Sequence, residues 1–160
     1  MRESLGEALQ RGLIDQPTFD QILARLHCTT EQSALAKADL VVEAIFENLD
    51  SMQEMFKKLE PMVMPEAMLA TNTSGISIVL LQKELDYKER FIGMHWAEPA
   101  EITKYLEISP GEGTADYAIE MGRQIGLHCD KQPSILNYDL PGLISNRMMY
   151  AMMREAIHLV

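Results

Sequence analysis

Cysteine is scarce in this chain, with only Cys28 and Cys129 among 160 residues. Small secreted proteins that depend on disulfides carry more cysteines, whereas a chain of this length can bury a stabilising core without them. We therefore expect both thiols to be reduced in an intracellular protein. The length corresponds to about one domain, and the 47% of apolar residues is typical of a folded globular protein.

Basic clusters and long apolar runs are also missing. The net charge is −10, and no run of lysine or arginine could neutralise a nucleic-acid backbone. No apolar run approaches the roughly 20 residues that span a bilayer. The N-terminal sequence MRESLGEALQRG lacks the apolar segment of a signal peptide. We therefore expect a cytoplasmic protein that binds neither nucleic acid nor membranes.

The order of the apolar segments predicts an α/β fold. Two short helices come first, one with Leu5 and Leu9 on a shared face and one that Asp15 caps. The apolar run at 39–46 then predicts a central parallel strand, and Asn48 begins a helix that lasts until Pro61. The remaining expected elements are strands at 68–73, 91–96, 105–109 and 126–130, and helices within 76–85, within 114–124 and from Asn146 onward. This alternation indicates a wound α/β sheet.

Polar residues follow three of the expected strands at the point where each strand ends. In open α/β sheets, ligands bind beyond the carboxyl ends of the strands. We therefore expect a ligand site among these polar residues, which include Glu47, Asn48, Asn72, Thr73, Ser74 and His95.

His95 follows the apolar residues of one strand and is a candidate general base. An imidazole fills that role near neutral pH only if a second group fixes its tautomer and supports the imidazolium. Glu107 stands twelve residues later between apolar neighbours, where a carboxylate without a partner would be costly to bury. One interpretation pairs Glu107 with His95 across neighbouring strands. The other makes His95 a hydrogen-bonded core residue and turns Glu107 outward on an edge strand, and spacing alone does not separate the two.

Ser74 permits a different hypothesis, since a serine between a strand and a helix is also where α/β hydrolases place their nucleophile. The sequence NTSGI lacks the glycine two positions before the serine that this turn needs, so a hydrolase is disfavoured. Ser74 could instead cap the next helix. Gly111 and Gly113 imitate a dinucleotide fingerprint, but Asp116 stands at the third glycine position and a loop is predicted. No metal-ligand spacing links the other histidines, His27, His128 and His158.

Five segments together carry a family resemblance: LVVEAIFENL, LATNTSGISI, RFIGMHWAEP, YLEISPG and DLPGLISNR, in this order. Over nearly its whole length the sequence resembles the L-3-hydroxyacyl-coenzyme A dehydrogenases. The resemblance implies oxidation of a 3-hydroxyacyl-CoA to the 3-oxoacyl-CoA, with NAD as the cofactor. It further implies a partial Rossmann-like NAD-binding domain at residues 1–138, the start of an all-helical domain at 139–160, and a homodimer of the full-length protein.

The resemblance also implies the catalytic roles. His95 matches the histidine that takes the hydroxyl proton, and Glu107 matches the acid that pairs with it. Ser74 matches a serine that hydrogen-bonds the reacting oxygen, and Asn146 matches an asparagine near the thioester carbonyl. Such donors can stabilise charge that develops at the reacting oxygen. The positions that match the nicotinamide half of the cofactor site are Ala44, Glu47, Asn72 and Ser74.

The sequence departs from the family in three places. Glu98 stands where the family has an asparagine, so the resemblance does not specify which acyl group is accepted. Met52 stands where the family has a lysine on the cofactor side. The glycine fingerprint that would hold the pyrophosphate is not found before Asp39. We therefore expect this chain alone to be weakly active or inactive. The alternative is a truncated, non-catalytic relative that serves as a binding or interaction module.

Overall fold

The computed structural model describes residues 2–159, and the chain forms two compact units, Met1–Ala34 and Leu35–Val160. The first unit contains helices α1 (Arg2–Gln10) and α2 (Gln16–Ala24). Asp15 caps α2 as predicted, because its carboxylate accepts a hydrogen bond from Thr18 N at 2.9 Å.

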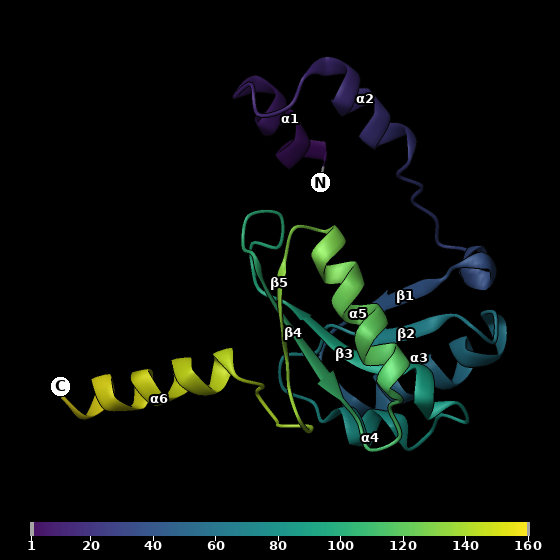
Figure 1. The fold of residues 1–160 in the computed structure, drawn as a ribbon, viewed down its shortest axis with the longest axis vertical. Coiled ribbons are helices and arrows are strands. Elements are labelled where there is room, and N and C mark those ends of the chain that lie inside the picture. Colours follow the sequence, from purple (N-terminus) through teal and green to yellow (C-terminus); the bar gives the residue numbers. More distant parts are fainter. Residues whose placement is uncertain (1, 160) are drawn as a thin grey trace. The chain divides into compact units, whose positions relative to one another are not determined.

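A five-stranded sheet forms the centre of the second unit (Figure 1). Its strands lie in chain order: β1 (Leu40–Glu43), β2 (Met68–Thr71), β3 (Phe91–Trp96), β4 (Tyr105–Pro110) and β5 (Gln132–Ile135). The first three strands are parallel, β4 is antiparallel to β3, and β5 is parallel to β4. The predicted α/β class is confirmed.

Helices cover both faces of this sheet. Helices α3 (Leu49–Leu59) and α4 (Ile78–Gln82) cover one face, and α5 (Asp116–His128) covers the other. Helix α6 (Ser145–His158) extends away from the sheet (Figure 1), and 3-10 turns lie at Gln32–Lys37, Glu60–Met62 and Lys88–Arg90. Asn48 caps α3 as predicted, since its side chain accepts from Ser51 N. No helix within residues 2–159 is both long and apolar enough to cross a bilayer.

Two apolar clusters fix these helices on the sheet. Met52 and Phe56 of α3 pack with Leu81 of α4 against one face, and all three are fully buried. On the other face, α5 packs against Ile92 and Ile108, as Figure 1 shows by its position over β3 and β4. Burial of this apolar area is the main stabilising contribution to the fold.

Gly122 allows α5 to approach the sheet closely. A Cβ atom at this position would lie 2.6 Å from Ile92 Cδ1, which is shorter than any normal contact. A side chain at this position would therefore have to displace the end of the Ile92 side chain, which is packed in the core.

Two strand predictions are wrong. Within the described residues, the strand in segment 39–46 is Leu40–Glu43 and lies at the edge of the sheet, because β1 pairs with β2 alone. A continuous apolar run does not distinguish a central strand from an edge strand, and Val42 is 38% exposed. The strand predicted at 126–130 is absent because α5 continues to His128, and the last strand is β5, where Pro133 is tolerated in an edge position.

Arg90 is a buried cation directly before β3, and it donates hydrogen bonds to several backbone carbonyl groups. It is 2% exposed, and its Nη1 donates to the carbonyl oxygens of Met64 at 2.6 Å and of Pro65 and Ala67 at 3.1 Å. Its Nη2 lies 3.4 Å from the carbonyl oxygen of Glu60. The guanidinium group therefore provides hydrogen bonds to backbone carbonyl groups between α3 and β2 that would otherwise be buried without partners.

We expect Arg90→Lys to lower the free energy of unfolding by about 2 kcal/mol, because a single ammonium group cannot reach these separate acceptors. The comparison is Arg123→Lys, which changes an exposed ion pair of α5 with Glu120 and should change the free energy of unfolding much less, because solvent screens such a pair. Urea unfolding of both variants measures the difference. Equal midpoints for the two variants would contradict the proposed role of Arg90.

Candidate active site

Polar side chains meet at the edge of the sheet where the parallel strands β1, β2 and β3 end. β4 runs in the opposite direction, so its first residues come to the same edge. Glu47 and Ser74 lie in the loops after β1 and β2, His95 lies near the end of β3, and the three belong to one hydrogen-bonded group. This is the edge at which open α/β sheets bind ligands.

His95 and Glu107 form the central pair of this group. They are directly opposite in the register of β3 and β4, so both side chains lie on the same face. His95 Nδ1 lies 2.7 Å from Glu107 Oε2, and the two side chains are 11% and 0% exposed. The interpretation that turned Glu107 outward on an edge strand is wrong, because β4 lies between β3 and β5.

Glu107 is held in place by the start of α6. Its carboxylate accepts hydrogen bonds from Ile144 N at 2.7 Å, from Ser145 N at 2.9 Å and from Ser145 Oγ at 2.7 Å. Burial alone would raise the pKa of Glu107, but the hydrogen bonds from Ser145, His95 and Ile144 outweigh it and hold the pKa below its ordinary value. Glu107 is therefore ionised at neutral pH.

The ionised Glu107 fixes the tautomer of His95. A carboxylate can only accept, so the Nδ1 atom of His95 carries the hydrogen and Nε2 keeps its lone pair. Ser74 Oγ lies 3.2 Å from Nε2 and donates to it. A bound hydroxyl group could therefore give its proton to Nε2, with Glu107 stabilising the imidazolium that forms.

Asn146 completes the group that the sequence predicted. Its Nδ2 donates to the carbonyl oxygen of Ser74 at 3.3 Å, so α6 contacts the turn after β2. The structure thus brings Ser74, His95, Glu107 and Asn146 together. The simpler interpretation of Ser74 as a helix cap is wrong, because Ser77 caps α4.

Glu47 binds the same turn from the other side. Its Oε1 accepts from Thr73 Oγ1 at 2.8 Å, from Gly75 N at 3.2 Å and from Ser74 N. Burial alone would raise the pKa of Glu47, but the hydrogen bonds from Thr73, Ser74 and Gly75 and the neighbouring His95 lower it. In a hydrolase, backbone amide groups beside the nucleophile would have to donate hydrogen bonds to the oxyanion that forms during acyl transfer. Here the amide groups of Ser74 and Gly75 already donate to the Glu47 carboxylate. This geometry argues against a hydrolase.

The residues expected at the cofactor lie on this edge too. Ala44 directly follows β1 and is exposed. Asn72 Oδ1 accepts from Trp96 N at 2.9 Å. The NH₂ group of Asn72 can therefore donate a hydrogen bond to the carbonyl oxygen of a nicotinamide carboxamide. A Cβ atom on Gly75 would meet only Glu47 Oε2, at an ordinary contact distance of 3.6 Å, apart from the neighbouring residues of the chain.

These residues fit the nicotinamide end of a dinucleotide and not its pyrophosphate. The loops after the three parallel strands, at residues 44–48, 72–77 and 97–100, contain no lysine or arginine. The ionised Glu47 would also repel a phosphate group. Met52, the position of the cofactor-side lysine in the resemblance, is fully buried in the apolar core.

Sequence reasoning missed the residues that hold Glu107. Ser145 and the amide of Ile144 lie 38 and 37 residues away from it along the chain. The only local signal was that α6 was expected to begin near Asn146. Nothing in the pattern indicated that this helix would begin beside β4.

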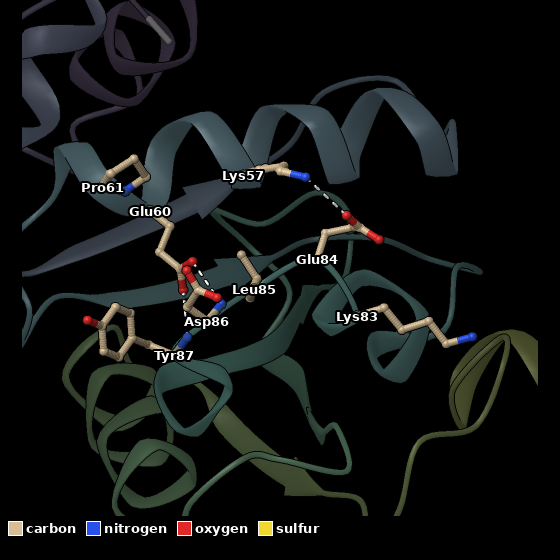
Figure 2. Close-up of a pocket in the computed structure, with 8 residues that line it drawn as sticks. All are labelled: Lys57, Glu60, Pro61, Lys83, Glu84, Leu85, Asp86 and Tyr87. Carbon is tan, nitrogen blue, oxygen red and sulfur yellow. Dashed lines mark hydrogen bonds and ion pairs between the residues drawn. The ribbon is translucent and has the colours of Figure 1, made fainter.

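Other polar features lie away from this edge. A cavity of about 490 Å³ is lined by Lys57, Glu60, Lys83 and Tyr87, among others, and Figure 2 shows it between the end of α3 and the segment before β3. It therefore lies at the opposite end of the strands from His95. Residues 2–159 contain no group of three or more His, Cys, Asp or Glu side chains that could hold a metal ion, and the remaining histidines, His27, His128 and His158, are exposed.

Comparison with known proteins gives a consistent result. The family model described as "3-hydroxyacyl-CoA dehydrogenase, NAD binding domain" matches residues 1–138. A probable 3-hydroxybutyryl-CoA dehydrogenase of Deinococcus radiodurans is 37% identical over 161 residues, which cover 100% of this chain and 57% of that protein. The 3-hydroxyadipyl-CoA dehydrogenase of Escherichia coli K12 is 36% identical over 152 residues, 95% of this chain and 32% of that protein.

A solved structure agrees with these sequence matches. The crystal structure of a 3-hydroxybutyryl-CoA dehydrogenase from Escherichia coli K12 superposes with a TM-score of 0.92 at 34% identity. The match covers 98% of this chain and 34% of that chain. The chain thus spans at most about three fifths of the relatives named here.

Proposed function

The chain belongs to the 3-hydroxyacyl-CoA dehydrogenase family, and from this premise we propose that it carries the proton-transfer site of an NAD-dependent 3-hydroxyacyl-CoA dehydrogenase. The observation that supports this most is the hydrogen-bonded series Ser74–His95–Glu107 at the ligand-binding edge of the sheet. Bound NAD would supply the hydride acceptor.

His95 is the general base of the proposed reaction. Its Nε2 takes the proton of the substrate 3-hydroxyl group as the alcohol is oxidised, and it returns a proton in the reverse direction. Glu107 keeps Nδ1 protonated and offsets the positive charge that develops on the ring. Both side chains are almost completely shielded from water, which strengthens this interaction.

Ser74 and Asn146 position the substrate. Ser74 Oγ lies 3.2 Å from Nε2 of His95, and when a substrate hydroxyl takes its place at Nε2 the Ser74 hydroxyl can rotate and donate to the oxygen that is oxidised. Asn146 lies beside the same turn and matches the family position near the thioester carbonyl. In this proposal Ala44, Glu47, Asn72 and Ser74 also form the wall for the nicotinamide.

The test is turnover by the full-length protein with acetoacetyl-CoA and NADH, followed by the loss of reduced-nicotinamide absorbance. We expect a rate constant in the usual enzymatic range of roughly 1 to 10³ per second. A series of acyl chain lengths then determines which substrate the protein with Glu98 accepts, and NADPH tests cofactor choice.

The alternative remains a non-catalytic binding or interaction module. Binding of acyl-CoA without oxidation or reduction at any chain length would favour this alternative and refute the dehydrogenase. The division at residues 138/139, the homodimer of the full-length protein and the cytoplasmic location stay predictions.

A further inference from the structure

Glu43 is a buried carboxylate that the proposed chemistry does not use. It ends the edge strand β1 and is 5% exposed. Burying an ionisable side chain is unfavourable unless hydrogen bonds compensate for the lost water. An apolar pair at such a place commonly supports a fold as well or better. The presence of Glu43 therefore calls for a role in local geometry.

Both carboxylate oxygens of Glu43 are engaged. Oε2 accepts from Thr71 Oγ1 at 2.6 Å, and Oε1 accepts from Ile45 N at 2.5 Å. Thr71 is directly opposite Glu43 in the register of β1 and β2, and it is fully buried. One side chain thus joins the loop after β1 to the last residue of β2.

The contact continues into the turn that carries Ser74. Thr71 Oγ1 accepts from Thr73 N at 3.2 Å, and Thr73 Oγ1 donates to Glu47 Oε1 at 2.8 Å. Glu47 in turn binds the amide groups of Ser74 and Gly75. The hydroxyl of Thr71 can do this only because it donates to Glu43 and keeps its lone pairs for Thr73.

We propose that Glu43, acting through Thr71, is a positioning residue that sets the turn at residues 72–75 and so places Ser74 beside His95. The inference rests on the proposed function, because positioning matters only if Ser74 and His95 act on a substrate. A small displacement of reacting groups costs up to about 10²-fold in rate, which makes such a residue measurable.

The chain provides a conservative pair of variants at Thr71. Thr71→Val keeps the shape and removes the hydroxyl, whereas Thr71→Ser keeps the hydroxyl. We expect Thr71→Val to lower kcat about tenfold or more, with KM for the acyl-CoA within about twofold, and Thr71→Ser to retain most of the turnover. Glu43→Gln should resemble Thr71→Val, because an amide has one acceptor oxygen in place of two.

Glu60 supplies the matched control. It is 6% exposed, and its carboxylate accepts from Asp86 N and Tyr87 N at 2.9 Å each, as the dashed lines in Figure 2 show. It lies at the opposite end of the sheet from Ser74. Glu60→Gln should therefore reduce the melting temperature as Glu43→Gln does, and leave kcat unchanged.

Two results would overturn the proposal. The first is normal kcat in Glu43→Gln and Thr71→Val while their melting temperatures fall, because the contact would then be structural only. The second uses hydrogen exchange of the amides of Ser74 and Gly75, which should accelerate in Thr71→Val and not in Glu60→Gln. Unchanged exchange there refutes the positioning role even if the wild type shows no turnover, whereas absent wild-type turnover with accelerated exchange refutes only the dehydrogenase proposal.

Discussion

Replacing His95 by glutamine in the full-length protein should lower kcat by roughly two to four orders of magnitude. Glutamine keeps a polar side chain of similar reach but has no group that accepts a proton near neutral pH. Binding of the acyl-CoA should change little, since the contacts expected from Ser74 and Asn146 remain. His95 is largely buried and its Nδ1 hydrogen bonds Glu107. The other members of the series, the Ser74 hydroxyl and the Glu107 carboxylate, do not take its place as the proton acceptor, because Glu107 lies on the far side of the imidazole and a neutral hydroxyl is a weak base.

The comparison for this variant is His128→Gln. His128 is exposed at the end of α5, and its ring nitrogen bonds the carbonyl oxygen of Gln124 at 2.9 Å. Its replacement should leave turnover unchanged. Steady-state kinetics with NADH and acetoacetyl-CoA, together with thermal melting, separates a chemical effect from a loss of folded protein. Wild-type turnover in His95→Gln would remove His95 from the chemistry.

Replacing Glu107 should have two effects that different substitutions separate. In Glu107→Gln the amide can still accept from the α6 backbone, but its NH₂ group would meet Nδ1 of His95 and favour the tautomer with hydrogen on Nε2. That tautomer cannot take a proton at Nε2, the atom that faces the substrate in the proposed reaction, so we expect kcat to fall by roughly two to four orders of magnitude. Glu107→Ala should in addition lower the free energy of unfolding by about 3 kcal/mol or more, because Ile144 N and Ser145 N lose their acceptor.

The effect of Glu107 on stability should depend on pH in a defined direction. Its pKa in the folded protein lies below the ordinary value of 4.5. Its ionised form therefore stabilises the fold fully above that value, and this contribution is lost as the pH falls further through the folded pKa. The difference in unfolding free energy between wild type and Glu107→Gln should shrink as the pH drops below 4.5.

Urea unfolding at several acid pH values measures this difference. Glu155→Gln, at an exposed position of α6, is the comparison and should show no such trend. If the difference in unfolding free energy between wild type and Glu107→Gln stays constant as the pH falls, the hydrogen bonds of Glu107 do not depend on its ionised form, and the prediction is wrong.

Much of the local structure followed from short-range patterns. Asp15 and Asn48 were predicted as helix caps, and each accepts the expected backbone hydrogen bond. The strand at 91–96 and the helix up to residue 59 were predicted from the spacing of apolar residues. Caps and periodicity act over a few residues, so they can be recognised without knowing the fold.

The positions of the strands within the sheet were harder to predict. The apolar run of β1 was predicted to be a central strand, because its residues are apolar on both faces. In the structure Val41 is buried and Val42 is exposed, a difference that two identical side chains do not reveal in the sequence. Gly126 looked like the start of a strand, but it lies inside α5, where a side chain would meet Leu106 and Pro133. In both cases the deciding contact comes from a segment distant in the sequence.

The sequence by itself determined the α/β class, most helix and strand positions, and the candidates His95, Glu107, Ser74 and Asn146. Only the tertiary structure decided that Glu107 faces His95, that the start of α6 binds its carboxylate, and that Glu43 joins β1 to β2 through Thr71. The physical reason is that propensities and caps depend on neighbouring residues, whereas the register of strands and the hydrogen bonds of buried carboxylates depend on segments that meet only when the chain folds.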